Sequence, residues 1–401
     1  MVVSAGADEG GRVAVALHHL ESEDVAVEGE RTIEVRDLEV HVSDVDPRID
    51  RFGHTPNASA RALRAAVGVQ PRSGVQCGTA RMDGDAASPG EGKANVRRAR
   101  ARGGAPARPA GTERGADVAV AAVRPRGPFS LRLSTRLASD ATRIVRNGML
   151  RAVVDVDGEL EGVEAWQRPD GTVLVRARTA EAVDQVRFVL ALDADHSEFL
   201  IRFADDPLLG AAVRRLRGLR PVRCATVTQA LLRALCGQLI SSHLARATER
   251  RIVRAATPAL DKLHAPPTPA MLGRFAPAEL RKLGLAGPRA SALVRLCRSL
   301  DLERLREAET EATANRLLRE PRLGPWSIGV ICLEGLGRYE RGLVGDLGLI
   351  KLLSSLRGRR VEAWETAELL EPYGPWAGLA SVYMLAAFKE GLLPLPQRLA
   401  A

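Results

Sequence analysis

The sequence contains few aromatic residues, and nearly all of them lie beyond its first third. Phenylalanine, tryptophan and tyrosine make up 3% of the 401 residues, and only Phe52 precedes position 129. A segment without large apolar side chains cannot bury enough area to offset the conformational entropy that it loses on folding. We therefore expect residues 1–125 to be a low-complexity, disordered extension rather than a packed domain.

Lysines, cysteines and long apolar runs are also scarce. Only five of the 58 basic residues are lysines, and the five cysteines are scattered without the spacing of a disulfide framework or a zinc site. No apolar run approaches the ~18 residues that a membrane span requires, and the N-terminus lacks the order of a secretory signal. These absences predict a cytoplasmic protein with no membrane partner.

The positive charge lies in the part of the chain that is expected to fold. Residues 1–50 carry four basic and thirteen acidic groups, and residues 51–125 carry thirteen basic and five acidic groups, so these two segments nearly cancel. The remaining 126–401 hold 41 basic and 31 acidic groups. This surplus suits a polyanionic partner such as nucleic acid, and it also occurs in basic proteins that have no such partner.

The hydrophobic pattern changes twice after residue 129. Short β-branched runs at 149–158 and 172–178, separated by the turn signal Arg168-Pro-Asp-Gly, predict a small antiparallel sheet between about 129 and 203. After residue 205 the apolar period becomes helical. Helices are expected at 227–240, 243–255, 277–283, 288–300, 303–318, 326–335, 347–356, 362–370 and 376–388.

These patterns predict an α+β protein of three parts. A disordered extension (1–125) would precede a small antiparallel β-rich domain (126–205) and a mostly helical domain (206–395).

The most informative stretch is Leu317-Leu-Arg-Glu-Pro-Arg-Leu-Gly-Pro-Trp-Ser-Ile-Gly-Val-Ile-Cys-Leu. It predicts a helix, a tight turn and a second helix that begins at Pro325, because proline suits the first helical position and Gly324 permits close backbone approach. Free amides at such a helix start can bind phosphate. Twenty residues past Trp326, Asp346 is expected at the start of another helix, whose dipole keeps a carboxylate ionised.

Four motifs in this order resemble the helix-hairpin-helix (HhH-GPD) DNA glycosylases, most closely 3-methyladenine DNA glycosylase II. They are Cys236-Gly-Gln-Leu-Ile-Ser, Gly324-Pro-Trp-Ser, Gly345-Asp-Leu-Gly and Glu371-Pro-Tyr-Gly-Pro-Trp-Ala-Gly-Leu-Ala. The resemblance covers about 206–390, and it extends more weakly over 129–203 because that family carries a small β-rich domain before its helices. The family's hairpin usually reads Pro-Gly-Ile-Gly, whereas this one reads Pro-Arg-Leu-Gly at 321–324.

The resemblance implies a monofunctional DNA N-glycosylase that flips alkylated purines of the 3-methyladenine type out of duplex DNA and excises them, which starts base excision repair. Such a base is electron-poor, so the enzyme has mainly to expose the bond and stabilise an oxocarbenium-like sugar. Asp346 is the candidate catalytic residue, as electrostatic stabiliser and as base for the attacking water. The alternative for a lone aspartate before a helix is a simple N-cap.

The resemblance also implies roles for other residues. Trp326 would stack on the flipped base, and Tyr339 and Trp376 are further candidates for the base pocket, with ordinary core packing as the alternative. Gln238 and Leu239 would form the wedge that fills the gap in the duplex, although Leu239 also continues an apolar helix face. The hairpin that binds the DNA backbone comprises Pro321, Arg322, Leu323, Gly324, Pro325 and Ser327.

Two absences narrow the expected reaction. No lysine lies between Lys282 and Lys351, so the amine with which bifunctional relatives attack the sugar is missing. The last cysteine, Cys332, precedes Asp346, so the C-terminal iron–sulfur loop of some relatives cannot form. We expect no cofactor beyond a monovalent cation at the hairpin, and a monomer that binds double-stranded DNA in the nucleoid.

Two other functions remain open at this level. One is a non-catalytic helix-hairpin-helix protein that binds DNA without releasing a base. The other is a glycosylase for a different damaged base, because one sequence does not reveal the shape of the base pocket.

Overall fold

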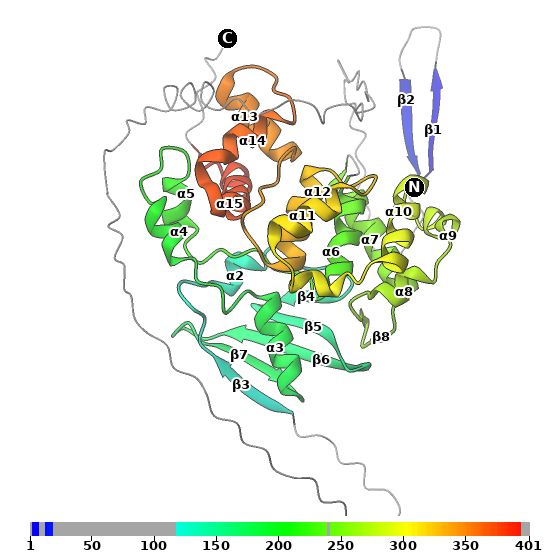
Figure 1. Cartoon of the computed structure of the whole chain (residues 1–401), viewed down its shortest axis with the longest axis horizontal. Helices are drawn as coiled ribbons and strands as arrows, with labels where there is room; N and C mark the ends of the chain where they lie inside the picture. The colour runs from blue at the N-terminus through cyan, green and yellow to red at the C-terminus, as the bar shows by residue number, and fades with distance from the viewer. Residues whose placement is uncertain (1, 8–12, 19–117, 239–240, 394–401) are drawn as a thin grey trace, which may run out of the picture. The chain divides into compact units, whose positions relative to one another are not determined.

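The computed structural model describes residues 2–7, 13–18, 118–238 and 241–393 (Figure 1). The chain divides into two compact units at residue 56. In the first unit, β1 (Val2–Ala7) and β2 (Val13–His18) form an antiparallel pair within the expected extension. Residues 19–117, the bulk of the expected extension, lie outside the described residues.

A five-stranded antiparallel sheet opens the second unit and confirms the predicted β-rich part. Its strands follow the order β3-β7-β6-β5-β4. They are β3 (Ala119–Val123), β4 (Arg143–Arg146), β5 (Met149–Val156), β6 (Glu159–Gln167) and β7 (Val173–Ala177). Strand β3 lies before residue 126, where the domain boundary is expected, and it pairs with β7 of the same sheet. The prediction missed this edge strand because backbone pairing with β7 requires no aromatic side chain.

Tight turns set the register of the central strands. Asn147 and Gly148 link β4 to β5, and Asp157 and Gly158 link β5 to β6. All four residues have positive φ, between 50° and 88°, as the two-residue hairpin turns of antiparallel sheets require. Asn-Gly and Asp-Gly are the dipeptides that favour such turns, so the register is encoded locally.

Helix α3 (Ala180–Val189) packs on the sheet and covers the strands β5, β6 and β7 (Figure 1). Val186 and Leu190 from this helix segment form a buried cluster with Leu150, Val163 and Val175 of the strands. The expected sheet region 129–203 therefore also contains helices, namely α2 (Leu131–Ser134), α3 and α4 (Ser197–Arg202). Their short apolar repeats pack against the sheet or the helical part.

The remainder of the described chain is helical, as predicted. The elements are α5 (Gly210–Arg215), α6 (Val227–Gly237), α7 (Ser242–Ala256), α8 (Pro269–Gly273), α9 (Pro277–Lys282), α10 (Gly287–Ser299), the 3₁₀ helix η1 (Glu303–Arg306), α11 (Thr310–Leu318), α12 (Pro325–Val330), the π-helix η2 (Ile331–Leu336), α13 (Leu347–Arg357), α14 (Glu365–Leu370), the 3₁₀ helix η3 (Glu371–Trp376) and α15 (Ala377–Glu390). A short strand pair, β8 (Ala259–Leu260) and β9 (Leu263–His264), interrupts them. None of the described helices is long and apolar enough to cross a membrane.

Helix α6 lies at the centre of the helical core. Nine of its residues are buried, and it packs against α7, α10, α12 and η2. Figure 1 shows α6 between the α11–α12 pair and α7. A mostly apolar sequence, interrupted by Thr228, Gln229 and Arg233, accounts for this position, because a helix that is hydrophobic on most sides is stable only when other elements surround it.

A buried ionic cluster joins α6 to three other parts of the fold. The guanidinium of Arg233 pairs with Asp140 at 2.8 Å, Glu249 at 2.9 Å and Glu334 at 2.7 Å. Asp140 lies in the loop before β4, Glu249 on α7 and Glu334 on η2. Burial raises the pKa of Glu249, which is the most enclosed of the three carboxyls. The cluster therefore fixes the sheet to the helical core.

Candidate active site

Asp346 forms the N-cap of α13. One carboxylate oxygen, Oδ1, accepts the backbone N–H groups of Gly348 at 2.8 Å and Leu349 at 3.4 Å. The preceding turn is fixed because the Gly345 amide donates to Oγ1 of Thr366 at 2.7 Å, and Gly345 has a φ of 85° that favours glycine. The predicted position at a helix start is confirmed, and the second oxygen, Oδ2, is directed away from the helix amides.

Trp326 provides a hydrogen bond to that second oxygen. Its indole Nε1 donates to Oδ2 of Asp346 at 3.0 Å. The far edge of the ring lies against bare backbone on α6, since a Cβ added at Gly237 would come within 2.4 Å of Cη2 of Trp326. Gly237 therefore makes room for the indole, and the ring in turn holds the carboxylate in place.

The turn at 319–324 connects α11 and α12 and forms the expected hairpin. Leu323 is buried and its amide donates to the Glu320 carbonyl at 3.1 Å, while Pro321, Arg322 and Pro325 are exposed. Arg322 has a φ of 75°, in the left-handed region where glycine is favoured. The hairpin geometry is thus retained although arginine stands where the usual motif has glycine.

Gln238 ties this hairpin to the end of α6. Its side-chain Nε2 donates to the carbonyl of Arg322 at 2.7 Å and to Oγ of Ser327 at 3.0 Å. Its Oε1 accepts Nε of Arg289, from the first turn of α10, at 2.9 Å. The predicted wedge role of Gln238 stays a prediction, because these contacts give its amide an anchoring role; Leu239 lies outside the described residues.

Tyr339 and Trp376 lie together at a second position. Their rings are stacked, with centroids 6.1 Å apart and planes inclined by 21°. They line a hollow of about 320 Å³ together with two carboxylates and a guanidinium. The remaining lining residues are Glu198, Gly337, Arg338, Glu340 and Pro375. Trp326 and Asp346 are not among the residues that line this hollow, so the structure separates the three rings predicted for the base pocket into two groups.

Helix α15 relates the two groups. Segment 339–348 contacts α15 at two places. The Tyr339 carbonyl accepts the amide of Gly378 at 2.7 Å, and Gly348 lies against the side chain of Leu385. Gly378 and Leu385 are seven residues apart on α15, which corresponds to about 10 Å along the helix axis. The backbone of Tyr339 and the first turn of α13, which Asp346 caps, therefore contact one side of this helix.

His196 packs against both rings of the stacked pair. It is 2% exposed and packs edge-on against Tyr339, with ring centroids 4.9 Å apart. Neither ring nitrogen has a hydrogen-bond partner among the described residues. Burial, with the nearby charges of Arg220 and Arg223, lowers the pKa of His196 to about 3. The imidazole is therefore neutral in the folded protein.

This neutral histidine predicts an acid sensitivity of folding. The unfolded chain protonates His196 near its ordinary pKa of 6.5, while the folded chain does not until about pH 3. Its contribution to the free energy of unfolding is present above pH 6.5 and declines as the pH falls, by about 2 kcal/mol between about pH 7 and pH 5. In His196→Phe this decline should be absent. Urea unfolding of both proteins at the two pH values checks it, and equal pH dependences would refute it.

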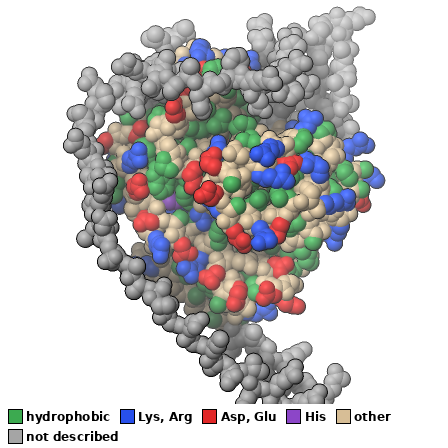
Figure 2. All heavy atoms as spheres, in the orientation of Figure 1, with side chains coloured by type: hydrophobic (Ala, Val, Ile, Leu, Met, Phe, Trp, Pro, Cys, Tyr) green, Lys and Arg blue, Asp and Glu red, His purple; other side chains and the backbone are tan. Residues whose placement is uncertain are grey.

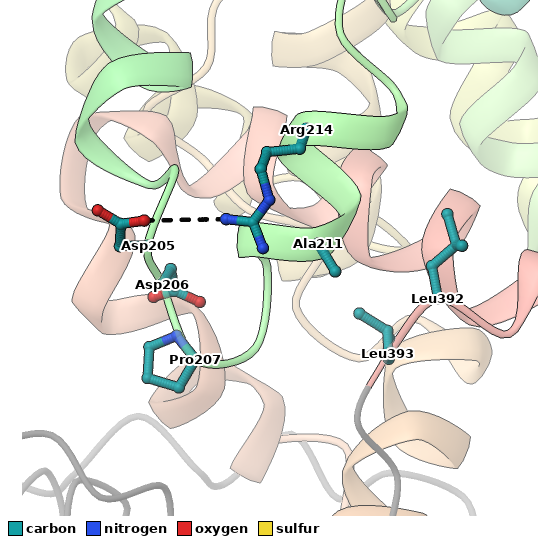
Figure 3. Close-up of a pocket in the computed structure, with 7 residues that line it drawn as sticks. All are labelled: Asp205, Asp206, Pro207, Ala211, Arg214, Leu392 and Leu393. Carbon is teal, nitrogen blue, oxygen red and sulfur yellow. Dashed lines mark ion pairs between the residues drawn. The ribbon is translucent and has the colours of Figure 1, made fainter.

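A separate hollow of about 450 Å³ lies near the end of the described chain (Figure 3). It is formed by Asp205, Asp206 and Pro207, by Ala211 and Arg214 of α5, and by Leu392 and Leu393. The carboxylate of Asp206 accepts the amides of Leu208 and Leu209 and the hydroxyl of Tyr373, so it stabilises a turn. None of the residues that the sequence predicts for the site lines this hollow.

The described residues contain no group of three or more His, Cys, Asp or Glu side chains that could hold a metal ion. On the face drawn in Figure 2, basic and acidic side chains are interspersed over the described part. The charge surplus is therefore not gathered into one basic patch on this face, and recognition has to be argued from individual residues.

Sequence comparison finds relatives among DNA repair enzymes. No protein-family model matches the chain. A DNA-3-methyladenine glycosylase of Bacillus subtilis is 22% identical over 266 residues, which cover 61% of this chain and 84% of the relative. A probable bifunctional transcriptional activator/DNA repair enzyme AlkA of Mycobacterium tuberculosis is 28% identical over 211 residues, 51% of this chain, and the chain spans 42% of that relative's length.

Solved structures share the fold. The 3-methyladenine DNA glycosylase of Archaeoglobus fulgidus superposes with a TM-score of 0.60 at 22% identity, covering 67% of this chain and 98% of that one. The 8-oxoguanine glycosylase/lyase of Clostridium acetobutylicum, solved with double-stranded DNA, gives 0.57 at 19% identity over 69% of this chain and 98% of that one. The homologues and structural neighbours of this chain are helix-hairpin-helix DNA glycosylases. The coverage includes the sheet as well as the helices.

Three residues of this candidate site were not found from the sequence. Gly237 receives the Trp326 ring, Thr366 holds the turn before Asp346, and Arg289 anchors Gln238. Only Gly237 could have been recognised from its sequence neighbours, because it is a glycine at the end of a helix within the Cys236-Gly-Gln motif. The other two act across long sequence separations.

Proposed function

We propose that the chain is a DNA N-glycosylase that excises alkylated purines from duplex DNA and starts base excision repair. The observation that carries the proposal is the pairing of Asp346 with Trp326 at 3.0 Å, beside the α11–α12 hairpin. The helix amides and the indole N–H together stabilise the ionised carboxylate. Asp346 faces the deoxyribose, stabilises its developing positive charge and accepts a proton from the attacking water.

The hollow at Tyr339 and Trp376 supports the choice of base. Its stacked rings present aromatic surface, and its two carboxylates, Glu198 and Glu340, outnumber its one guanidinium, that of Arg338. A base that carries positive charge after alkylation is attracted to both, through cation–π and Coulombic interactions. We propose that the extruded nucleotide places its base toward these rings and its sugar toward Asp346, and that Trp326 flanks it.

Duplex DNA is proposed to bind along the hairpin. The Leu323 amide is already used inside the turn, so the phosphate contacts fall to the amides of Gly324, Trp326 and Ser327 and to nearby arginines. Carbonyls of Glu320 and Arg322 accept N–H donors from Leu323 and Gln238. Because these carbonyls are already engaged, we propose no monovalent cation at this turn.

The proposed reaction is hydrolysis without strand cleavage. A lyase needs an amine beside the sugar to form a Schiff base. Here an indole occupies the position beside Asp346, and its nitrogen donates to the carboxylate rather than acting as a nucleophile. We therefore propose a monofunctional enzyme that leaves an abasic site.

The test uses the full chain with duplexes that carry alkylated, oxidised or deaminated bases. Mass spectrometry identifies the released base, and a denaturing gel detects strand breaks. Release of 3-methyladenine without breaks supports the proposal. Release of 8-oxoguanine alone would reassign the substrate, and DNA binding without release of any base would leave a non-catalytic binding protein.

Trp326→Phe is expected to slow base release by about 10- to 100-fold. The phenyl ring is smaller and leaves part of the space beside Gly237 empty, and the hydrogen bond to Oδ2 of Asp346 is lost. A hydrogen bond to a charged group contributes about 1.5–3 kcal/mol. Single-turnover kinetics on methylated duplex measure the effect. Trp364→Phe is the control, since that tryptophan is 63% exposed and should tolerate the change. A wild-type rate in Trp326→Phe would contradict the positioning role.

A further inference from the structure

Arg322 occupies a backbone conformation that arginine disfavours. Its φ of 75° lies in the left-handed region, where a side chain with a Cβ is strained relative to glycine. The turn imposes this conformation, because the Arg322 carbonyl is fixed by Nε2 of Gln238 at 2.7 Å and the next amide is fixed by Glu320. The side chain itself is exposed, so burial of its aliphatic stem does not offset the strain.

A second arginine lies beside it. Arg289 is held by Gln238, through Nε to Oε1 at 2.9 Å and through NH2 to the backbone carbonyl at 3.2 Å. Burial lowers the pKa of Arg289, and the positive charge of Arg322 lowers it further. Gln238 thus holds the Arg289 guanidinium beside the backbone of Arg322, and the positive charges of the two residues repel.

Neither arginine has a carboxylate partner within the part of the chain that the structure describes. Arginines nearby do have them: Arg295 and Arg316 both pair with Glu320 behind the turn. Two adjacent unpaired cations, one of them on a strained backbone, are unfavourable in the free protein. An anion placed between them would remove the repulsion and accept hydrogen bonds from both.

We propose that Arg289 and Arg322 form a two-arginine clamp for one backbone phosphate of duplex DNA, a contact that glycine at position 322 could not make. The inference rests on the proposed function, because it assumes that DNA lies along the hairpin. Arg322 then adds a side-chain contact to the phosphate contacts of the hairpin amides, at a cost in folding stability.

The test compares three variants of Arg322 in the full chain. Arg322→Gly removes both the strain and the charge, Arg322→Ala removes only the charge, and Arg322→Lys keeps both. Thermal unfolding gives Tm, and fluorescence anisotropy gives the affinity for a labelled duplex between about 50 and 200 mM salt. Arg151→Ala is the matched control, because Arg151 is a 60% exposed arginine on β5.

The clamp predicts opposite effects on stability and binding. Arg322→Gly should raise Tm by about 2–4 °C and lower the slope of log K against log salt by about 0.9. Arg322→Ala should lower the slope equally with a smaller rise in Tm, because it relieves the repulsion but keeps the backbone strain. Arg322→Lys and Arg151→Ala should leave the slope unchanged. A wild-type slope in both Gly and Ala variants, or a reduced slope in Lys, would overturn the clamp.

Base release in the same preparations separates this inference from the proposed function. A wild-type chain that binds duplex with the predicted salt dependence but frees no base refutes the glycosylase and leaves the clamp standing. A chain that frees methylated bases while its Arg322 variants keep the wild-type slope refutes the clamp alone. A chain that binds no duplex refutes both.

Discussion

Asp346→Asn should reduce the release of 3-methyladenine by about 10²–10⁴-fold, the range that a positioned acid–base group contributes. Asparagine can still accept the amides of Gly348 and Leu349, so α13 keeps its cap and the fold is retained. Only the negative charge opposite the sugar is lost. Single-turnover base release measures the loss, and binding to a duplex with a stable abasic analogue should stay within about threefold of wild type.

Asp206→Asn is the matched control for this substitution. Asp206 has the same local role, because its Oδ1 accepts the amides two and three residues ahead, but it lines the other hollow (Figure 3). We expect its base release to be unchanged. Turnover of Asp346→Asn within about threefold of the wild-type rate would show that Asp346 is only an N-cap.

Arg233→Met should lower the free energy of unfolding by about 3–5 kcal/mol near neutral pH. Methionine has a similar volume, but three carboxylates would lose their shared cation inside the fold, and an unpaired buried charge is costly. Urea unfolding measures the effect. Arg304→Met is the control, since Arg304 and Glu307 are each 75% exposed and such pairs contribute about 0–1 kcal/mol.

The same variant should show a distinct pH dependence. Burial already raises the pKa of Glu249, and removal of Arg233 would raise it further. A carboxyl whose folded pKa lies above its unfolded value contributes stability below the unfolded pKa and loses it as the pH rises through the folded pKa. The deficit of Arg233→Met should therefore shrink on acidification from about pH 8 to pH 5. A deficit that grows on acidification would contradict the carboxylate explanation.

Much of the site was encoded in short motifs. In the Gly324-Pro-Trp-Ser stretch, Pro325 begins α12. Gly345 adopts the left-handed conformation that precedes the N-cap, Asp346. Both features could be predicted from local rules. The partners of these residues could not. Gln238 reaches Arg322 across 84 positions, and the sequence offers no pattern that would reveal such a hydrogen bond.

Departures from the predicted fold have similar causes. Strand β3 escaped detection because Ala-Val-Ala-Ala-Val carries no aromatic residues, and pairing with β7 through the backbone establishes it. The expected single helix at 303–318 is instead η1 followed by α11. Glu303 explains the break in part, since its carboxylate turns away to accept the amides of Val227 and Thr228 at the start of α6.

The sequence by itself determined the class of fold and the helix starts and turns, because each depends on a few neighbouring residues. It also singled out Asp346 as the candidate catalytic carboxylate, through the order of motifs that resembles a glycosylase family. The tertiary structure alone decided that the indole of Trp326 serves Asp346, that Tyr339 and Trp376 form a separate wall backed by His196, and that Gln238 brings two arginines together. These arrangements depend on packing between segments that are distant in the sequence. The contact of Gly237 with the Trp326 ring and the bond from Gln238 to the Arg322 carbonyl form only once the whole chain has folded.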